Sequence, residues 1–266
     1  MKTIELNNGI RIPAIGFGVF QIPAAQTKKA VGNAIASGYR LIDTARAYGN
    51  ETEVGEAIRD CGLHREELFV TTKVYGAGSI TEARSLIDGS LKKLNIGYLD
   101  LMLIHCPLRN NAALWKAMEE YVEKGLIKSI GFSNFYEGDL DEIYDTASIK
   151  PVVNQIECHV YRAGESNRQL FEKRGMLMEA WSPLSSGRSN IFTDKVLSAI
   201  GRKYGKSNAQ IALRYLVERG IIPVVKTTHK ERMTENLNIF DFSLSEEDLN
   251  NIRSLDNGKS VWGMYD

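Results

Sequence analysis

The sequence predicts an α/β fold, a (β/α)8 TIM barrel formed by one domain over residues 1–266. Eight short apolar runs alternate along the chain with longer segments whose apolar residues recur every three or four positions. The runs are nearly continuous, as expected for parallel strands buried on both faces under helices. No linker or low-complexity segment divides the 266 residues, and about 250 residues is the usual size of such a barrel.

The first expected element is a β-hairpin over residues 3–13, "TIELNNGIRIP". Apolar residues alternate on either side of Asn7, Asn8 and Gly9. Asn-Gly is a strong hairpin signal because glycine tolerates the positive φ that a primed turn requires. The hairpin is expected to precede the first barrel strand.

The eight expected strands are the apolar runs after the hairpin. Helical spacing is clear over residues 83–94 and 114–124. A doubly wound open sheet is the alternative, but its GxGxxG motif is absent, since "GFGVFQ" has two glycines and then departs from it. The expected strands are residues 14–19, 40–44, 68–73, 100–105, 127–134, 152–157, 177–182 and 222–227.

Composition argues against several other classes of protein. Lys and Arg number 33, as do Asp and Glu, so nothing favours a nucleic-acid or membrane-surface partner. No apolar run reaches the roughly 18 residues that span a bilayer, and the start lacks the layout of a signal peptide. Neither the three cysteines nor the histidines have metal-ligand spacing, so no metal is expected. We expect a cytoplasmic protein and, without a heptad or self-complementary patch, a monomer.

In a (β/α)8 barrel the active site forms where the strands end on their carboxyl side. The first polar groups after each run should therefore meet at one rim. They include an acid, a phenol, an amine and an imidazole. In chain order they are Asp43, Tyr48, Lys73, His105, Ser133, Asn134, Asn154, Gln155, Trp181, Ser182, Lys226, Thr227 and Thr228.

Four of these residues form a plausible proton relay. A phenol such as Tyr48 has a pKa near 10, and a nearby cationic amine lowers it. Lys73 supplies the amine, and Asp43 is the carboxylate that would keep this amine charged in a recessed site. His105 can orient a carbonyl oxygen and stabilise charge on it. The set suits reduction of C=O, for which a cofactor must supply the hydride.

Each residue by itself also has a simpler interpretation. Asp43 could cap a helix, Lys73 could be a solvated loop lysine, and Tyr48 could be a surface aromatic. His105 could be a satisfied rim histidine, and Trp181 could pack on the barrel. Their joint placement at one rim favours the catalytic interpretation.

These residues also carry a family resemblance. The segments "GYRLIDTARAYGNETEVG", "TTK", "LIHCP", "GFSN", "NQIE", "AWSPL" and "VVKTTHKERMTEN" occur in this order. Together they resemble the aldo-keto reductase family across nearly the whole chain, in particular its short-loop microbial and protozoan members. The resemblance implies a barrel whose bottom is closed by the N-terminal hairpin and an NADP+-type alcohol dehydrogenase activity. Tyr48 would be the proton donor, Lys73 and Asp43 its tuning pair, and His105 the carbonyl-orienting group.

The resemblance also implies an NADPH/NADP+ site. Ser133, Asn134 and Gln155 would hold the nicotinamide carboxamide, and Trp181 would stack on its ring. The pyrophosphate path would be lined by Ser182, Leu184 and Ser186. Further along the cofactor, the 2′-phosphate and the adenine would be bound by Lys226, Thr227, Thr228, Arg232, Glu235 and Asn236. A lysine with a guanidinium suits a phosphate, although both cations could be ordinary surface charges near a helix start.

The expected substrate pocket departs from the family pattern. Val19, Phe20 and Cys106 stand where many relatives have a small polar residue and two tryptophans. Only seven residues separate Pro107 from Trp115 and nine follow Asn257, so the pocket walls should be low. This predicts broad specificity for small carbonyls. The candidate pocket residues are Phe20, Tyr48, Tyr75, His105, Cys106 and Trp262.

Two functional hypotheses follow from the sequence. The first is an NADPH-dependent aldehyde and ketone reductase. The second is a catalytically weak NADPH-binding sensor or scaffold, since a fold alone does not decide function. The complete set of Asp43, Tyr48, Lys73 and His105 favours the first. Metal-assisted hydrolysis is a remote third, because no ligand cluster is present.

Overall fold

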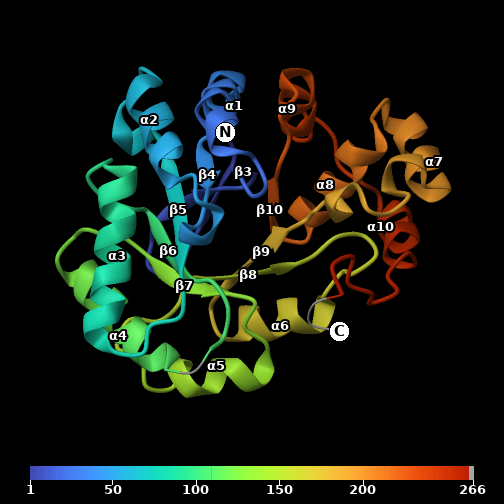
Figure 1. Ribbon diagram of the computed structural model, residues 1–266. Helices are drawn as coiled ribbons and strands as arrows, with labels where there is room; N and C mark the ends of the chain where they lie inside the picture. Colours follow the sequence, from blue (N-terminus) through green and yellow to red (C-terminus); the bar gives the residue numbers. More distant parts are fainter. Residues whose placement is uncertain (109, 264–266) are drawn as a thin grey trace.

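Eight parallel strands close into a barrel, and helices surround it (Figure 1). The computed structural model describes residues 1–108 and 110–263. The strands follow one another around the barrel in chain order, and β10 pairs with β3 to complete the ring. This confirms the predicted (β/α)8 fold. The strands are β3 (Gly16–Gly18), β4 (Leu41–Asp43), β5 (Phe69–Val74), β6 (Leu101–Ile104), β7 (Ile130–Ser133), β8 (Val153–Glu157), β9 (Leu177–Trp181) and β10 (Ile222–Val225).

Ten α-helices lie in the described part of the chain. They are α1 (Ala24–Ser37), α2 (Glu51–Asp60), α3 (Ile80–Leu94), α4 (Asn111–Glu123), α5 (Glu137–Tyr144), α6 (Glu165–Lys173), α7 (Lys195–Tyr204), α8 (Asn208–Glu218), α9 (Lys230–Leu237) and α10 (Glu246–Arg253). The two clearest predicted helices correspond to α3 and α4. Short 3-10 turns add η1 (Arg46–Tyr48), η2 (Arg65–Glu67), η3 (Ser185–Gly187) and η4 (Ile191–Thr193). Within the described residues no helix is long and apolar enough to cross a membrane.

Several strands are shorter than the apolar runs that predicted them. The run over residues 127–134 contains β7, which covers only four residues. At its start, Ile127 makes an isolated bridge to Leu99. At its end, Asn134 has a φ of 61°, which is incompatible with an extended strand. The strand therefore stops at Ser133, directly below the predicted site.

The N-terminal hairpin consists of β1 (Thr3–Glu5) and β2 (Arg11–Pro13), which pair antiparallel. Its turn differs from the expected primed turn. Only Gly9 has a positive φ, of 82°, while the Gly9 N–H donates to the Leu6 carbonyl at 2.9 Å and the Leu6 N–H to the Ile10 carbonyl at 2.8 Å. This is a turn followed by a glycine bulge, in which one left-handed residue is sufficient.

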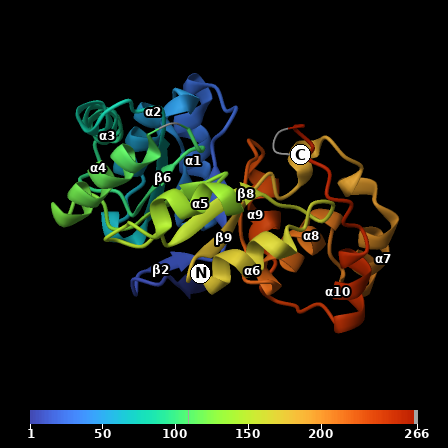
Figure 2. The same cartoon turned by 90° about the horizontal axis from the view of Figure 1, so that it is seen from below.

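The hairpin closes the amino-terminal end of the barrel. Leu6 and Ile12 pack in one buried cluster with residues at the starts of the strands, such as Leu41, Phe69 and Ile222. Figure 2 shows the dark-blue hairpin, marked by β2 and N, apart from the C-terminal tail. The hairpin lies on the bottom of the barrel, opposite the end where the catalytic residues were predicted.

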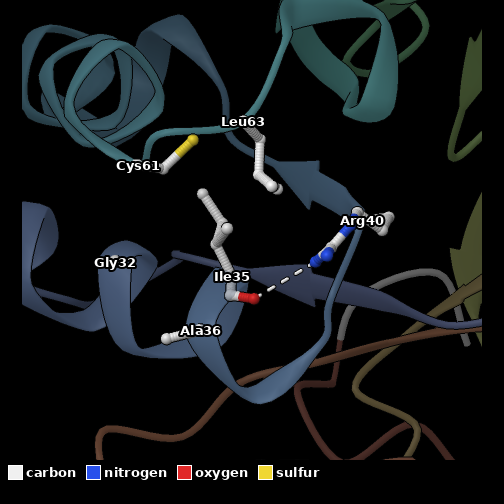
Figure 3. A pocket seen from close by; sticks show the side chains of 6 residues that line it. All are labelled: Gly32, Ile35, Ala36, Arg40, Cys61 and Leu63. Atoms are coloured by element: carbon white, nitrogen blue, oxygen red, sulfur yellow. Dashed lines mark hydrogen bonds between the residues drawn. The ribbon is translucent and has the colours of Figure 1, made fainter.

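Outside the barrel, a shallow pocket lies between the ends of α1 and α2 (Figure 3). Its volume of about 220 Å³ is below the roughly 300–1,000 Å³ of typical ligand sites. The Arg40 guanidinium bonds the Ile35 carbonyl at 3.2 Å, so its charge serves the local fold. The lining residues are Gly32, Ile35, Ala36, Arg40, Cys61 and Leu63.

Candidate active site

A buried ion pair between two neighbouring strands lies at the centre of the candidate site. Asp43 ends β4 and pairs in register with Thr71 of β5, so Lys73 lies two residues further on the same face. The Lys73 Nζ donates to both Asp43 carboxylate oxygens, at 2.6 and 2.7 Å, and to the Thr44 carbonyl at 3.2 Å. Lys73 is fully buried, which rules out a solvated loop lysine. Asp43 is not an N-cap among the described helices, since the two that follow β4 have Ala45 and Asn50 in this position.

Tyr48 completes this group from the loop after β4. It ends the short turn η1, and its hydroxyl accepts a hydrogen bond from the Lys73 Nζ at 3.3 Å. The buried side chain of Asn50 holds the loop in place. Its Oδ1 accepts from the Thr44 hydroxyl at 2.9 Å, and its Nδ2 donates to the Val19 carbonyl at 3.1 Å.

Burial and charge act on these groups in opposite directions. Burial raises the pKa of Tyr48, and although the Lys73 cation lowers it, the net pKa stays above its usual value. Burial lowers the pKa of Lys73, but the Asp43 charge and hydrogen bonds outweigh this and raise it. Near neutral pH the phenol is therefore protonated and the amine charged. Lys73 has the predicted influence on Tyr48, but burial is the larger effect.

His105 follows β6 and faces Tyr48 across the mouth of the barrel. The centroids of the two rings are 5.6 Å apart, and the centroid of the Tyr75 ring is also 5.6 Å from that of His105. Burial, together with the Lys73 charge, lowers the pKa of His105 to about 3, so the imidazole is neutral. Its buried Nδ1 has no hydrogen-bond partner in residues 1–108 and 110–263. A neutral imidazole can donate one hydrogen bond to a carbonyl oxygen.

The residues predicted to hold the nicotinamide carboxamide lie side by side: Ser133 ends β7, Asn134 follows it, and Gln155 lies on β8. The Ser133 hydroxyl donates to the Gln155 carbonyl at 3.0 Å. The Asn134 Nδ2 donates to the His105 carbonyl at 2.9 Å and to the Ser133 hydroxyl at 3.1 Å. The Asn134 Oδ1 accepts from the Trp181 indole at 2.8 Å. The fold thus uses both amide hydrogens of Asn134, and its oxygen keeps one lone pair for a ligand.

The loop after β9 contains the residues predicted for the pyrophosphate path, and the C-terminal tail lies on it. The Ser182 and Ser186 hydroxyls bond each other at 2.6 Å. The Trp262 indole N–H donates to these hydroxyls at 3.3 and 3.2 Å, and Leu184 is half-buried beside them. The Arg188 guanidinium covers the Trp262 ring at 3.5 Å. The indole N–H therefore occupies one lone pair on each of these two hydroxyl oxygens.

The tail is held by Glu157, a buried residue at the end of β8. Its carboxylate accepts from the Ser260 hydroxyl at 2.6 Å and from the Val261 N–H at 2.9 Å. It also bonds the His159 Nε2 at 3.2 Å. Sequence reasoning missed Glu157, because its partners in the tail, Ser260 and Val261, lie about a hundred residues away in the chain.

The residues predicted for the 2′-phosphate lie between β10 and α9. Lys226, Thr228 and Arg232 are exposed, and Lys226 and Arg232 have no ion-pair partner in the described chain. His229 precedes α9 without a side-chain cap, so the first N–H groups of this helix remain available. The Thr227 hydroxyl accepts from the His229 N–H at 3.2 Å.

The two residues predicted near the adenine already take part in the fold. Glu235 accepts a hydrogen bond from the Ser207 hydroxyl, and Asn236 is a buried residue of α9.

The predicted substrate pocket is open and aromatic. Phe20 and Tyr75 are 46% and 42% exposed. The Phe20 ring lies 4.9 Å from the Tyr48 ring and 6.0 Å from the Trp262 ring, measured between centroids. Burial raises the pKa of Cys106, so it is a neutral thiol. Five of the six pocket residues are thus joined by ring contacts around Tyr48.

Glu179, which sequence reasoning also missed, is a further acidic residue inside the barrel mouth. It lies on β9 and is fully buried. Its Oε2 accepts from the Gln155 Nε2 at 3.0 Å, and the same nitrogen donates to the Asp43 Oδ2 at 3.0 Å. An acid within the otherwise apolar "LMEAW" was the signal that could have revealed it. No cluster of His, Cys, Asp and Glu suited to a metal is found in the described residues.

Comparison with known proteins identifies relatives across the whole barrel. The Aldo/keto reductase family matches residues 14–257. Morphine 6-dehydrogenase of Pseudomonas putida is 40% identical, with 97% of this chain and 92% of that protein covered. Glyoxal reductase of Bacillus subtilis is 39% identical, with coverage of 97% and 94%. The crystal structure of an aldo-keto reductase from a Medee basin deep-sea metagenome library superposes with a TM-score of 0.94, at 38% identity and 96% coverage of both chains.

Proposed function

Because the chain belongs to the aldo/keto reductase family, we propose that it reduces small aldehydes and ketones to alcohols with NADPH. The observation that carries the proposal is the contiguous set of Asp43, Lys73 and Tyr48 beside a neutral His105. Glyoxal and methylglyoxal reductases are among the relatives, at 39% and 38% identity.

The proton for the carbonyl oxygen would come from Tyr48. Its phenol is protonated near neutral pH, and its ring contacts that of His105. When the proton leaves, the charge on the phenolate oxygen is stabilised by the Lys73 ammonium, whose Nζ is 3.3 Å away. Asp43 keeps this ammonium charged in a buried position. The phenolate then regains a proton from solvent.

His105 would orient the substrate. An N–H of the neutral imidazole can donate to the carbonyl oxygen that receives the Tyr48 proton. Because the pKa of His105 is lowered to about 3, the ring stays neutral throughout the physiological range and does not compete with Tyr48 as the acid.

A bound nicotinamide dinucleotide would supply the hydride. The residues present fit NADPH: Lys226 and Arg232 have no ion-pair partner within residues 1–108 and 110–263, and they lie near the uncapped start of α9, as a phosphate site requires. Ser133, Asn134 and Gln155 keep oxygen lone pairs for a carboxamide. Trp181, at the end of β9, is the candidate to stack on the ring.

We also propose broad substrate specificity and a monomer that acts in the cytoplasm. The open aromatic rim formed by Phe20, Tyr75 and Trp262 supports the first. A sedimentation mass of 29.7 kDa would support the monomer.

The first experiment follows NADPH oxidation against small aldehydes, α-dicarbonyls, keto sugars and quinones. With the Tyr48→Phe variant kcat should fall about 10²–10⁴-fold. Its Kd for NADPH should stay within about threefold of the parent value, because the phenylalanine ring keeps the contacts of the tyrosine ring with Phe20 and His105. Tight NADPH binding without turnover that depends on Tyr48 would instead identify a sensor or scaffold.

A second experiment tests the choice of cofactor. Arg232→Ala or Lys226→Ala should weaken NADPH about tenfold or more, as expected for a lost charge-assisted hydrogen bond. NADH, which lacks the 2′-phosphate, should bind each variant nearly as it binds the parent protein. Equal weakening of both cofactors would remove the 2′-phosphate assignment.

A further inference from the structure

The orientation of the Gln155 side-chain amide is fixed by two carboxylates. Its Nε2 donates to the Asp43 Oδ2 and to the Glu179 Oε2, both at 3.0 Å. The Asp43 carboxylate, which is ion-paired with Lys73, only accepts hydrogen bonds, so the alternative orientation would place the amide oxygen against an acceptor. Both hydrogens of the amide nitrogen are thus used, and the carbonyl oxygen is the polar side-chain atom left for a ligand.

Asp43 alone is a weak constraint on this amide. Its carboxylate is shared with the Lys73 ammonium, which bonds both of its oxygens. The terminal torsion of a glutamine side chain is broad, so one hydrogen bond leaves the amide plane poorly defined. The second hydrogen bond, to Glu179, fixes the plane.

Glu179 has no other evident task. It lies in register with Gln155 on the neighbouring strand and is fully buried. The hydrogen bond from Gln155 is the one found for its side chain in the described chain, where its Oε1 has no partner. Burial, together with the Asp43 charge, raises the pKa of Glu179 to about 7. A buried carboxyl with an unpartnered oxygen destabilises a fold, so stability does not explain its presence.

We propose that Glu179 is a positioning residue for the cofactor. By fixing the side-chain amide of Gln155, it directs the side-chain oxygen Oε1 of Gln155 to the amide hydrogens of the nicotinamide carboxamide. The site would then favour a ring with a carboxamide over one with a group that cannot donate. This inference rests on the proposed function, since it assumes that a nicotinamide cofactor binds at Ser133, Asn134 and Gln155.

The test compares the binding of NADP+ with that of its 3-acetylpyridine analogue, in which a methyl group replaces the amide nitrogen. Dissociation constants are measured by isothermal titration calorimetry, so the result does not depend on turnover. The parent protein should bind the analogue about 3–10 times more weakly, as expected for one lost hydrogen bond. The quantity compared is the ratio of the analogue's dissociation constant to that of NADP+. Glu179→Leu should reduce this ratio to within about twofold of one.

Two further variants separate positioning from general damage. Glu179→Gln keeps an acceptor for Gln155, while Asp43 still requires a donor there, so this variant should keep the ratio of the parent. Asp100→Leu removes another buried carboxylate, at the bottom of the barrel, and should lower the melting temperature without changing the ratio.

The outcomes are distinct. A folded Glu179→Leu protein with the ratio of the parent would overturn the inference and leave the reductase proposal intact. A parent protein that binds both ligands equally would do the same. A parent protein that binds neither ligand would overturn the cofactor assignment itself, and the inference with it.

Discussion

The two ends of the barrel are built differently. At the bottom, Leu6 and Ile12 of the hairpin pack on the apolar starts of the strands and exclude water. Towards the mouth, the strands of the barrel carry buried polar groups, among them Asp43, Lys73 and Glu179. The apolar packing at the bottom stabilises the fold, whereas the mouth holds polar groups whose burial costs free energy.

The backbone shows the same difference. Turns at the bottom adopt positive φ mainly at glycine, for example at Gly38 (112°) and Gly220 (72°). Six of the seven described non-glycine residues with positive φ lie in loops that follow a strand's carboxyl end. Such residues are strained, and strain tends to occur at functional sites. The six are Gln21, Asn110, Asn134, Ser182, Ser185 and Ser186.

Each end also has an ion pair with a buried acid. At the bottom, Asp100 bonds Arg65 at 2.6 Å, and the Arg65 side chain is 17% exposed. At the mouth, Asp43 bonds Lys73, whose side chain is 1% exposed. Removing the acid leaves Arg65 close to water but leaves Lys73 in the barrel interior.

The largest expected effect comes from Asp43→Ala. It should lower the free energy of unfolding by about 3–5 kcal/mol, because the buried Lys73 loses its counter-charge. Asp100→Ala should lower it by about 1–2 kcal/mol, since water can reach Arg65. Urea denaturation measures both. Equal losses in the free energy of unfolding would show that an unpaired cation costs the same at both ends of the barrel.

Next in size is Ile12→Ala in the bottom cluster. The cavity should lower the free energy of unfolding by about 2–4 kcal/mol. The kcat of the folded protein should change less than about twofold, because Ile12 lies at the opposite end from Tyr48. A larger change in kcat would show that packing at the bottom of the barrel affects the catalytic residues at the mouth. Denaturation and steady-state kinetics on the same preparation decide this.

A smaller effect concerns the pH dependence of stability. His105, with a pKa lowered to about 3, adds stability that is complete above about pH 6.5 and is lost as the pH falls. Glu179, with a pKa raised to about 7, adds stability that is complete below about pH 4.5 and is lost as the pH rises.

Between pH 4.5 and 6.5 these two slopes oppose each other. Glu179→Gln should therefore make stability rise more steeply with pH in this range than it does in the parent, by up to about 1 kcal/mol per pH unit. His105→Gln should change the slope in the opposite direction. Denaturation at several pH values gives the slopes, and unchanged slopes would contradict the assigned protonation states.

The smallest effect is a pair of opposite changes in the backbone. Gly38→Ala should destabilise by about 1–2 kcal/mol, because alanine is strained at a φ of 112°. Ser185→Gly should stabilise by up to about 1 kcal/mol, since it relieves a φ of 53° and removes a buried hydroxyl without a partner in the described chain. Thermal unfolding measures both. A destabilised Ser185→Gly protein would argue against strain at the mouth.

Much of the site could be predicted because its signals are local. Asp43, Tyr48, Lys73 and His105 follow apolar runs, and the carboxyl ends of parallel strands meet at one rim. The contacts of Gln155 could not be predicted. They depend on which inward-facing residues of β4, β8 and β9 lie at the same height, and this is set by the stagger of the strands around the barrel.

The sequence by itself determined the eight β/α units, the hairpin before them, and the residue types at the mouth, because hydrophobic period and turn chemistry act over a few residues. Only the tertiary structure decided that Glu179 shares Gln155 with Asp43 and that Trp262 lies on Ser182 and Ser186. These contacts join residues 24–112 positions apart, and barrel closure brings them together. Closure is a property of all eight strands at once, so no single segment encodes it.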